Sequence, residues 1–247
     1  KEFNKTRISP DPLEFLHYMD GVKNIEAAGF LASAFAYGRI SQFMKVLSGI
    51  FLKMQYKPYD FLMNSSENSL EDFDEFGYRF YSGNDTANLM KTLREVYVRF
   101  GGIREVFVGG DNPSDKNIKN ALSGLSRKMS EIFKMKSQTA TNLSYFFPDP
   151  FSGSACKRMN LFLRWMVRKD ELDFGIWKEI TPARLIIPVD VHISRIAIKL
   201  DLTSRKNISW KMAEEITDNL KIFCSEDPVK YDFALCHIGM RQIKFNY

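Results

Sequence analysis

The chain has 247 residues, of which 45% are hydrophobic and 26% are charged, a balance that excludes an intrinsically disordered protein. The net charge of +5 is uneven, because residues 153–211 hold twelve Lys/Arg against six Asp/Glu, a surplus of +6 that leaves the remainder near −1. A basic segment in a neutral body favours a polyanionic partner, of which nucleic acid is the commonest. A solvated basic face is the alternative interpretation.

The cysteine content and the hydropathy of the chain indicate its compartment. Cys156, Cys224 and Cys236 are spaced for neither a disulfide framework nor a zinc site, so we expect a reducing environment. No apolar run approaches the roughly 20 residues that span a bilayer, and the first residues lack the apolar core of a signal peptide. The sequence therefore predicts a cytoplasmic protein that has no membrane partner and needs no metal or other cofactor.

Helix signals in chain order predict an all-α fold of about ten helices. Three pairs are typical of helix starts: Asp11-Pro12, Thr181-Pro182 and Asp227-Pro228. Apolar residues recur at helical spacing in the ranges 25–35, 40–51 and 89–100. The one short candidate for a strand runs from Ile103 to Val108.

A stretch rich in aromatic residues and proline, Ser137 to Gly153, predicts a hinge. It divides the chain into an N-terminal helical body, residues 1–147, and a basic C-terminal half, residues 148–247. The expected architecture is a two-part helical bundle.

The segment from Gly153 to Arg168 carries the first candidate for chemistry. As a helix it would place Lys157 in the first turn, and Asn160, Arg164 and Arg168 would continue one polar stripe. The helix dipole disfavours a protonated amine in the first turn, and only a neutral amine attacks carbon. Lys157 is therefore a candidate nucleophile. A surface lysine tolerated by solvent is the alternative.

The segment from Leu185 to Leu200 carries the second candidate. Asp190 lies where an N-cap carboxylate would accept backbone N–H bonds, just before a stripe of apolar residues at helical spacing. The preceding apolar run should hold this carboxylate near the interior, where its charge acts at a lower dielectric constant. An ordinary capping aspartate is the alternative.

These two segments resemble the catalytic halves of the helix-hairpin-helix DNA glycosylase superfamily, such as endonuclease III and the archaeal oxoguanine glycosylases. The first resembles a helix that opens with Arg-Lys-Thr-Ala-Asn, and the second a Val-Asp-Thr-His segment. The matched positions are Lys157 and Asn160 in the first, and Val189, Asp190, His192, Arg195, Leu200 and Leu202 in the second. The resemblance covers residues 151–240, and the wider sequence also resembles an uncharacterised bacterial family of unknown function.

The resemblance implies that a damaged base is flipped from duplex DNA into a pocket between two helical halves. Lys157 would attack the anomeric carbon and form a Schiff base, and Asp190 would stabilise the developing cation. His192 and Arg195 would support these two groups. Contacts to DNA would come from Gly153, Ser154, Arg158, Asn160, Arg164, Arg168 and Lys169.

Two features depart from the superfamily. Its hairpin carries Leu-Pro-Gly-x-Gly, whose backbone N–H groups hold a phosphate, whereas the stretch from Pro150 to Ser154 has one glycine. Three scattered cysteines also exclude the iron–sulfur cluster of endonuclease III. For His192 we expect local hydrogen bonds rather than metal binding, because no ligand set accompanies it.

Three functions follow from these patterns. The preferred one is a DNA glycosylase with lyase activity, and the runner-up is a non-catalytic nucleic-acid-binding protein of the same fold, which the weakened hairpin favours. A protein-binding helical scaffold would leave the pairing of Lys157 with Asp190 unexplained.

Overall fold

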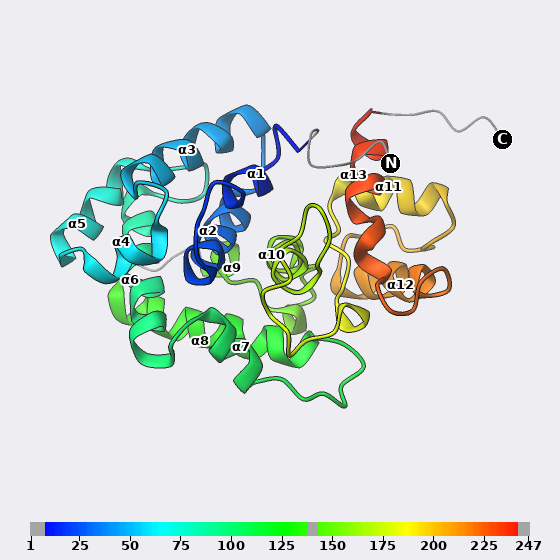
Figure 1. The fold of residues 1–247 in the computed structure, drawn as a ribbon. Helices are drawn as coiled ribbons and strands as arrows, with labels where there is room; N and C mark the ends of the chain where they lie inside the picture. The colour runs from blue at the N-terminus through cyan, green and yellow to red at the C-terminus, as the bar shows by residue number, and fades with distance from the viewer. Residues whose placement is uncertain (1–7, 138–142, 242–247) are drawn as a thin grey trace.

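The computed structural model describes residues 8–137 and 143–241, with side chains as far as Cys236 in the final helix. Helices dominate this part of the chain (Figure 1). The described residues form no β-strand, only isolated bridges between Tyr78 and Tyr81 and between Lys169 and Phe174. The predicted all-α class is therefore confirmed.

The helices follow the chain in a simple order. The α-helices are α1 (Leu13–Leu16), α2 (Val22–Phe35), α3 (Ile40–Lys53), α4 (Pro58–Asn64), α5 (Glu67–Glu71), α6 (Gly83–Phe100), α7 (Ile103–Gly109), α8 (Lys119–Lys136), α9 (Leu143–Phe146), α10 (Lys157–Val167), α11 (Val191–Lys199), α12 (Trp210–Lys221) and α13 (Asp232–Arg241). The short 3-10 helices are η2 (Asp72–Glu75), η3 (Pro150–Ser152), η4 (Pro182–Arg184) and η5 (Pro228–Tyr231).

One expectation about local structure is wrong. The candidate strand is the helix α7, because the Glu26 carboxylate accepts hydrogen bonds from the Ile103 and Arg104 N–H groups and so caps its first turn. Ile103 and Phe107, one helical turn apart, are both buried. The pairs at Thr181 and Asp227 do begin helices, each with proline in the first turn, and these are the short 3-10 helices η4 and η5.

Helix α10 lies between α2 and the C-terminal helices (Figure 1). At Gly29 in α2 an added Cβ would lie 2.8 Å from the Met166 Cε of α10, so the Met166 side chain packs directly on the α2 backbone at this position. Phe162 packs edge-on against Phe30 at a ring-centroid distance of 5.5 Å and also against Trp177. One hydrophobic core thus includes residues from both predicted parts of the chain, and α10 packs within it.

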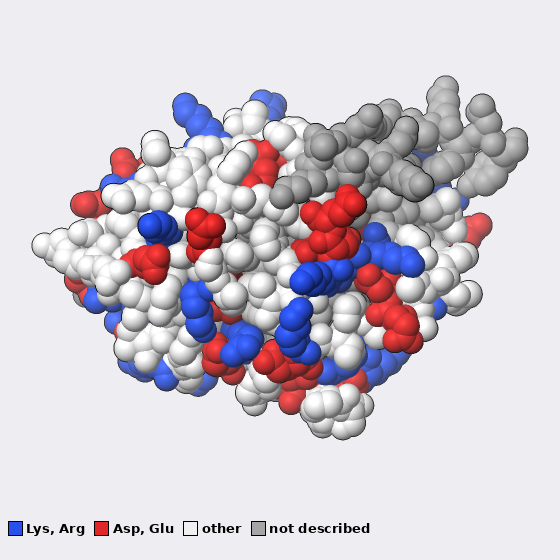
Figure 2. All heavy atoms as spheres, viewed as in Figure 1, with Lys and Arg blue, Asp and Glu red and all other residues white. Residues whose placement is uncertain are grey.

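The basic segment is less positive at its surface than its composition indicates. At least five of its twelve cations form ion pairs with carboxylates: Lys157, Arg164, Arg168, Arg184 and Arg205. Lys/Arg and Asp/Glu are also interspersed on the face of the molecule in Figure 2.

The hydropathy of the helices shows whether any of them could span a membrane. In the part of the chain that the structure describes, no helix is long and apolar enough to cross a bilayer.

Candidate functional site

A cavity of about 680 Å³ opens beside the N-terminal end of α10. This volume is in the range of roughly 300–1,000 Å³ that is usual for small-molecule pockets. Its walls come from the segment before α1, the α2–α3 connection, α9, α10, the start of α11 and α13. Aromatic and charged side chains that line it are Tyr37, Phe43, Tyr145, Phe233, Asp11, Lys157, Arg158, Arg164, Asp190 and Asp232.

Lys157 is the first residue of α10, as the sequence predicts. Cys156 precedes it in the left-handed region, at φ 48°, so the chain turns sharply into the helix and places the lysine side chain at the cavity wall. Lys157 Nζ lies 3.4 Å from Asp190 Oδ2, and the two side chains are 32% and 24% exposed. The structure thus brings the two predicted catalytic residues together. Their roles in catalysis stay a prediction.

The two carboxylate oxygens of Asp190 have different partners, one in helix α11 and one in the cavity. Oδ1 accepts hydrogen bonds from the His192 and Ile193 N–H groups, both at 2.9 Å, and so caps α11. Oδ2 is the atom that faces Lys157. The apolar residue before it, Val189, is buried, so the carboxylate stands at the edge of the core. The predicted cap is confirmed, and it also orients the carboxylate.

Sequence reasoning missed a second carboxylate in the cavity. Asp232, the first residue of α13, lines the cavity, is buried and accepts a hydrogen bond from Arg164 Nη1. Burial raises the pKa of Asp232 to about 6; Arg164 opposes this rise and Asp190 adds to it. The local sequence gave only a helix-start signal at Asp227-Pro228, and it contains nothing that places α13 against α10.

Two further groups at the cavity escaped prediction. Burial raises the pKa of Asp11, although the carboxylate also accepts a hydrogen bond from the Leu13 N–H. Burial raises the pKa of Cys236 to about 12, so this residue is a neutral thiol at physiological pH. Asp11 was recognised only as part of a helix-start signal, and Cys236 only in the cysteine count.

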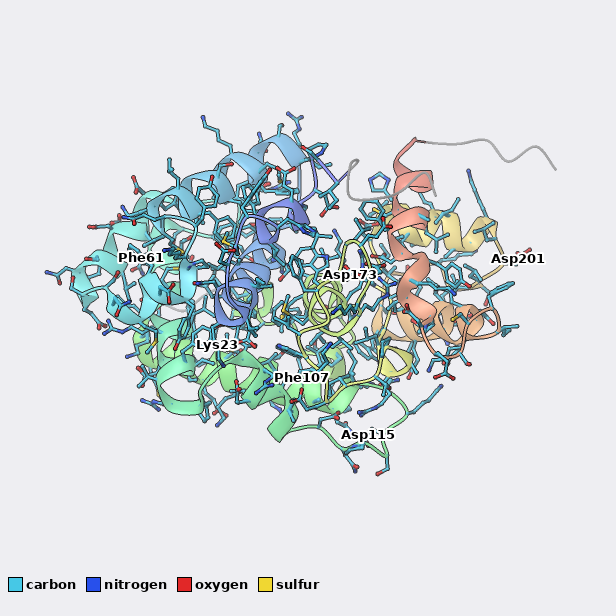
Figure 3. The ribbon with its side chains drawn as sticks, viewed as in Figure 1. Lys23, Phe61, Phe107, Asp115, Asp173 and Asp201 are labelled. Carbon is cyan, nitrogen blue, oxygen red and sulfur yellow. The ribbon has the colours of Figure 1, made fainter. Side chains whose placement is uncertain are left out.

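The prediction that Arg164 and Arg168 contact phosphates is wrong. Arg164 is 3% exposed and donates to both oxygens of Asp173 at 3.1 Å, as well as to Asp232. Arg168 is 5% exposed and bonds Asp227 and Asp173. Asp173 belongs to the loop after α10 and is labelled in Figure 3. The polar stripe therefore faces carboxylates inside the protein rather than solvent.

The predicted DNA contact of Asn160 is also wrong, whereas that of Gly153, which is exposed, stays a prediction. Asn160 is 1% exposed, and its Nδ2 donates to the Ala155 carbonyl at 3.0 Å, which holds the turn before α10. The Gly153 N–H donates to Pro150 O at 3.2 Å. The N–H groups of residues 151 and 152 likewise donate to Asp149. These three N–H groups are already bonded within the turn and cannot hold a phosphate.

The other predicted site residues differ in their relation to the cavity. Ser154 and His192 line it, and Arg158 does so while donating to Ala34 O, to the Tyr81 hydroxyl and to Tyr145 O. Arg195 and Lys169 are exposed and lie outside the residues that line the cavity. Contact of Ser154, Arg158 and Lys169 with DNA stays a prediction. Within the described ranges, no cluster of three or more His, Cys, Asp or Glu is suited to a metal ion.

Fold and site define an all-helical protein in which a lysine–carboxylate pair lies in an aromatic-lined cavity. Residues 11–241 match the model of a family described as a protein of unknown function (DUF2400), and the chain belongs to this family. No curated protein and no solved structure matches the chain. The expected membership of an uncharacterised family is thus confirmed, whereas the relation to helix-hairpin-helix glycosylases stays a prediction.

The raised pKa of Asp232 predicts a pH-dependent stability. Because the folded-state pKa of about 6 exceeds the ordinary value of 3.8, the contribution of Asp232 is complete below about pH 4 and is lost as the pH rises through about 6. At about 1.4 kcal/mol per pKa unit, wild type should lose roughly 3 kcal/mol relative to Asp232→Asn between about pH 4 and pH 7. Urea denaturation of both proteins across this range measures the difference.

The matched control is Asp201→Asn, since Asp201 is exposed and lies outside the cavity. Its stability should follow that of wild type at every pH. Equal pH profiles for wild type and Asp232→Asn would contradict the assignment.

Proposed function

We propose that this protein is a DNA glycosylase with abasic-site lyase activity, which acts through a Schiff base on Lys157. The observation that carries the proposal is the 3.4 Å separation of Lys157 Nζ and Asp190 Oδ2 inside one cavity. An amine and a carboxylate at this distance supply a nucleophile and a proton acceptor for covalent catalysis. The likeness of these two segments to the glycosylase motifs supports the same reaction.

The cavity supports a flipped base as substrate. Tyr37, Phe43, Tyr145 and Phe233 are among the residues that line the cavity and give it an aromatic wall for a planar base, and the volume of about 680 Å³ admits a nucleoside. A target base must leave the duplex before it can reach Lys157, and a pocket of this kind compensates for the lost stacking.

The proposed chemistry assigns one step to each group. The Nζ lone pair forms a bond to C1′ of the deoxyribose, while the C1′–N bond breaks and its electron pair leaves with the base. Asp190 Oδ2 takes a proton from Nζ and passes it to the departing base. The C1′–O4′ bond of the sugar then breaks, the ring oxygen takes up the second Nζ proton, and the nitrogen lone pair completes the imine (Schiff base). Asp190 also opposes the positive charge that develops on the sugar, and its cap bonds hold it in place as that charge forms. No metal or organic cofactor takes part.

The substitution Asp190→Asn tests whether the negative charge of the side chain, rather than its shape, is needed for catalysis. The amide keeps the size of the side chain and can still accept cap hydrogen bonds, but it cannot stabilise a cation or take a proton. We expect the single-turnover rate of base excision to fall by about 10² or more. The free energy of unfolding should change by about 1 kcal/mol, because the cap is only weakened. A rate within a few-fold of wild type on a substrate that wild type cleaves would show that Asp190 only caps the helix.

Borohydride trapping tests the proposed function directly. Wild-type protein is incubated with oligonucleotide duplexes that carry oxidised purines, oxidised pyrimidines or an abasic site, and sodium borohydride reduces the imine to a stable covalent complex. A trapped complex that maps to Lys157 is the expected result. Absence of trapping on the whole panel would overturn the proposal.

A non-catalytic nucleic-acid-binding protein of the same fold is the second candidate. The occupied N–H groups of residues 151–153 favour it, because a glycosylase hairpin uses such groups to hold its substrate. This candidate predicts DNA binding without trapping.

A further inference from the structure

A two-residue turn, Arg79-Phe80, lies next to the cavity and is held by backbone and side-chain hydrogen bonds. Reciprocal backbone hydrogen bonds close it, from Tyr78 N to Tyr81 O at 2.8 Å and from Tyr81 N to Tyr78 O at 2.9 Å. Arg79 occupies the left-handed region, at φ 52°. The turn therefore presents two adjacent exposed side chains, a cation and an aromatic ring.

A second pair of reciprocal bonds joins this turn to the cavity wall. The Tyr37 hydroxyl donates to Tyr78 O at 2.9 Å, and the Tyr78 hydroxyl donates to Tyr37 O at 2.7 Å. An added Cβ at Gly38 would lie 2.2 Å from Arg79 Nη1, so the guanidinium lies directly against this connection, where the φ of +82° favours glycine. Two hydrogen bonds thus close the turn, and two more join it to Tyr37 in the cavity wall.

The rings on this surface are nearly parallel. Phe80 stacks on Tyr145 at a centroid distance of 4.4 Å and an interplanar angle of 22°, and on Tyr37 at 6.1 Å and 11°. Phe80 is 47% exposed and Tyr145 is 38% exposed. Tyr37 and Tyr145 also line the cavity, so the stack continues from the exposed turn into the wall of the candidate site.

A positive charge accompanies the rings. The Arg79 guanidinium carbon lies 6.0 Å from the centroids of both Tyr37 and Phe80, and that of Arg158 lies 5.1 Å from the centroid of Tyr37. Rings interleaved with guanidinium groups are the pattern that binds nucleic-acid strands without sequence preference, because every base has a π face and every linkage a negative charge.

We propose that the ledge formed by Tyr37, Arg79, Phe80 and Tyr145 stacks on an unpaired nucleobase next to the nucleotide that enters the cavity. Arg79 would lie by the phosphate that joins the two nucleotides. The inference rests on the proposed function, because that function is what brings DNA to the cavity. It adds a class of substrate, which is DNA with unpaired bases beside the target nucleotide. The preferred ligand is a strand with unpaired bases beside the target, since a base paired within a duplex is already stacked on both faces.

Fluorescence of 2-aminopurine tests the ledge. The probe is an oligonucleotide with a tetrahydrofuran abasic analogue and 2-aminopurine beside it, used as a single strand and as a fully paired duplex. Wild type should quench the single-strand signal on binding, because stacking quenches this base. Phe80→Leu should remove the quenching and weaken single-strand affinity by about tenfold, with a change below about twofold for the duplex.

Arg79→Gln and a matched control complete the experiment. Arg79→Gln should keep the quenching while it lowers the salt dependence of binding by about one phosphate contact. Phe223→Leu changes an aromatic residue that is 70% exposed after α12 and lies outside the ledge, and it should behave as wild type. Melting curves establish that each variant is folded, and Arg79→Gln alone decides the result if Phe80→Leu does not fold.

The outcomes separate this inference from the proposed function. Quenching that depends on Phe80, without borohydride trapping, supports the ledge and rejects the lyase. Trapping with unchanged affinity and quenching in Phe80→Leu rejects the ledge and keeps the lyase. A wild-type protein that binds no single strand, or prefers the fully paired duplex, overturns the ledge.

Discussion

Lys157→Gln should reduce nicking at an abasic site to background while DNA binding stays within a few-fold of wild type. Glutamine has no amine, so no Schiff base can form on this side chain, and binding loses one charge that is already paired with Asp190. The melting temperature should change little, since the lysine is one-third exposed and its ion pair contributes at most about 1 kcal/mol. A nicking assay and fluorescence anisotropy on the same oligonucleotide measure the two effects.

The matched control for Lys157→Gln is Lys178→Gln, which removes an exposed lysine of the same basic segment away from the cavity. It should retain the activity of wild type. Full lyase activity in Lys157→Gln would mean that another amine is the nucleophile.

Arg164→Met should be the most destabilising of the substitutions considered, with a loss of about 3–5 kcal/mol in the free energy of unfolding. Methionine fills much of the space, but the buried carboxylates of Asp173 and Asp232 would lose their shared partner. Arg168 still forms an ion pair with Asp173, so Asp232 is the carboxylate that would be left without its arginine partner. Urea denaturation gives the value, and Arg195→Met on the exposed side of α11 is the matched control.

A double variant checks the cause of this loss. Because Asp232→Asn removes the charge left unpaired by Arg164→Met, the pair of changes should cost less than the sum of the two single changes. Additive losses, or a loss below about 1 kcal/mol for Arg164→Met, would show that the buried ion pairs contribute little.

Local signals predicted the parts of the site that depend on neighbouring residues. The start of α10 at Lys157 and the cap at Asp190 follow from turn and capping preferences within a few residues of each position. Their meeting across the cavity depended on tertiary packing, and only the likeness of the two segments to known motifs pointed to it. The all-α class followed from helical periodicity along the whole chain.

Periodicity did not reveal what faces the polar stripe of α10. It correctly placed Arg164 and Arg168 on one side of the helix, but the carboxylates that bury them come from the following loop and from α13. Alternation over six residues also could not distinguish a strand from α7, because the deciding contact is made by Glu26, far away in the sequence. In both cases a buried carboxyl group from another element, Asp232 for Arg164 and Glu26 for α7, makes a contact that the local pattern cannot reveal.

Because Oδ1 of Asp190 is bonded to helix α11 while Oδ2 faces the cavity, ligand binding should cost little side-chain conformational entropy at this residue. A flexible side chain loses rotamer freedom when a ligand immobilises it, and that loss weakens binding. At Asp190 the two bonds from the start of α11 to Oδ1 fix the rotamer as the helix forms, so the loss falls on folding rather than on recognition. Oδ2 is therefore already oriented when a ligand arrives, and the precision of this one atom is a property of helix α11 rather than of any residue that surrounds the cavity.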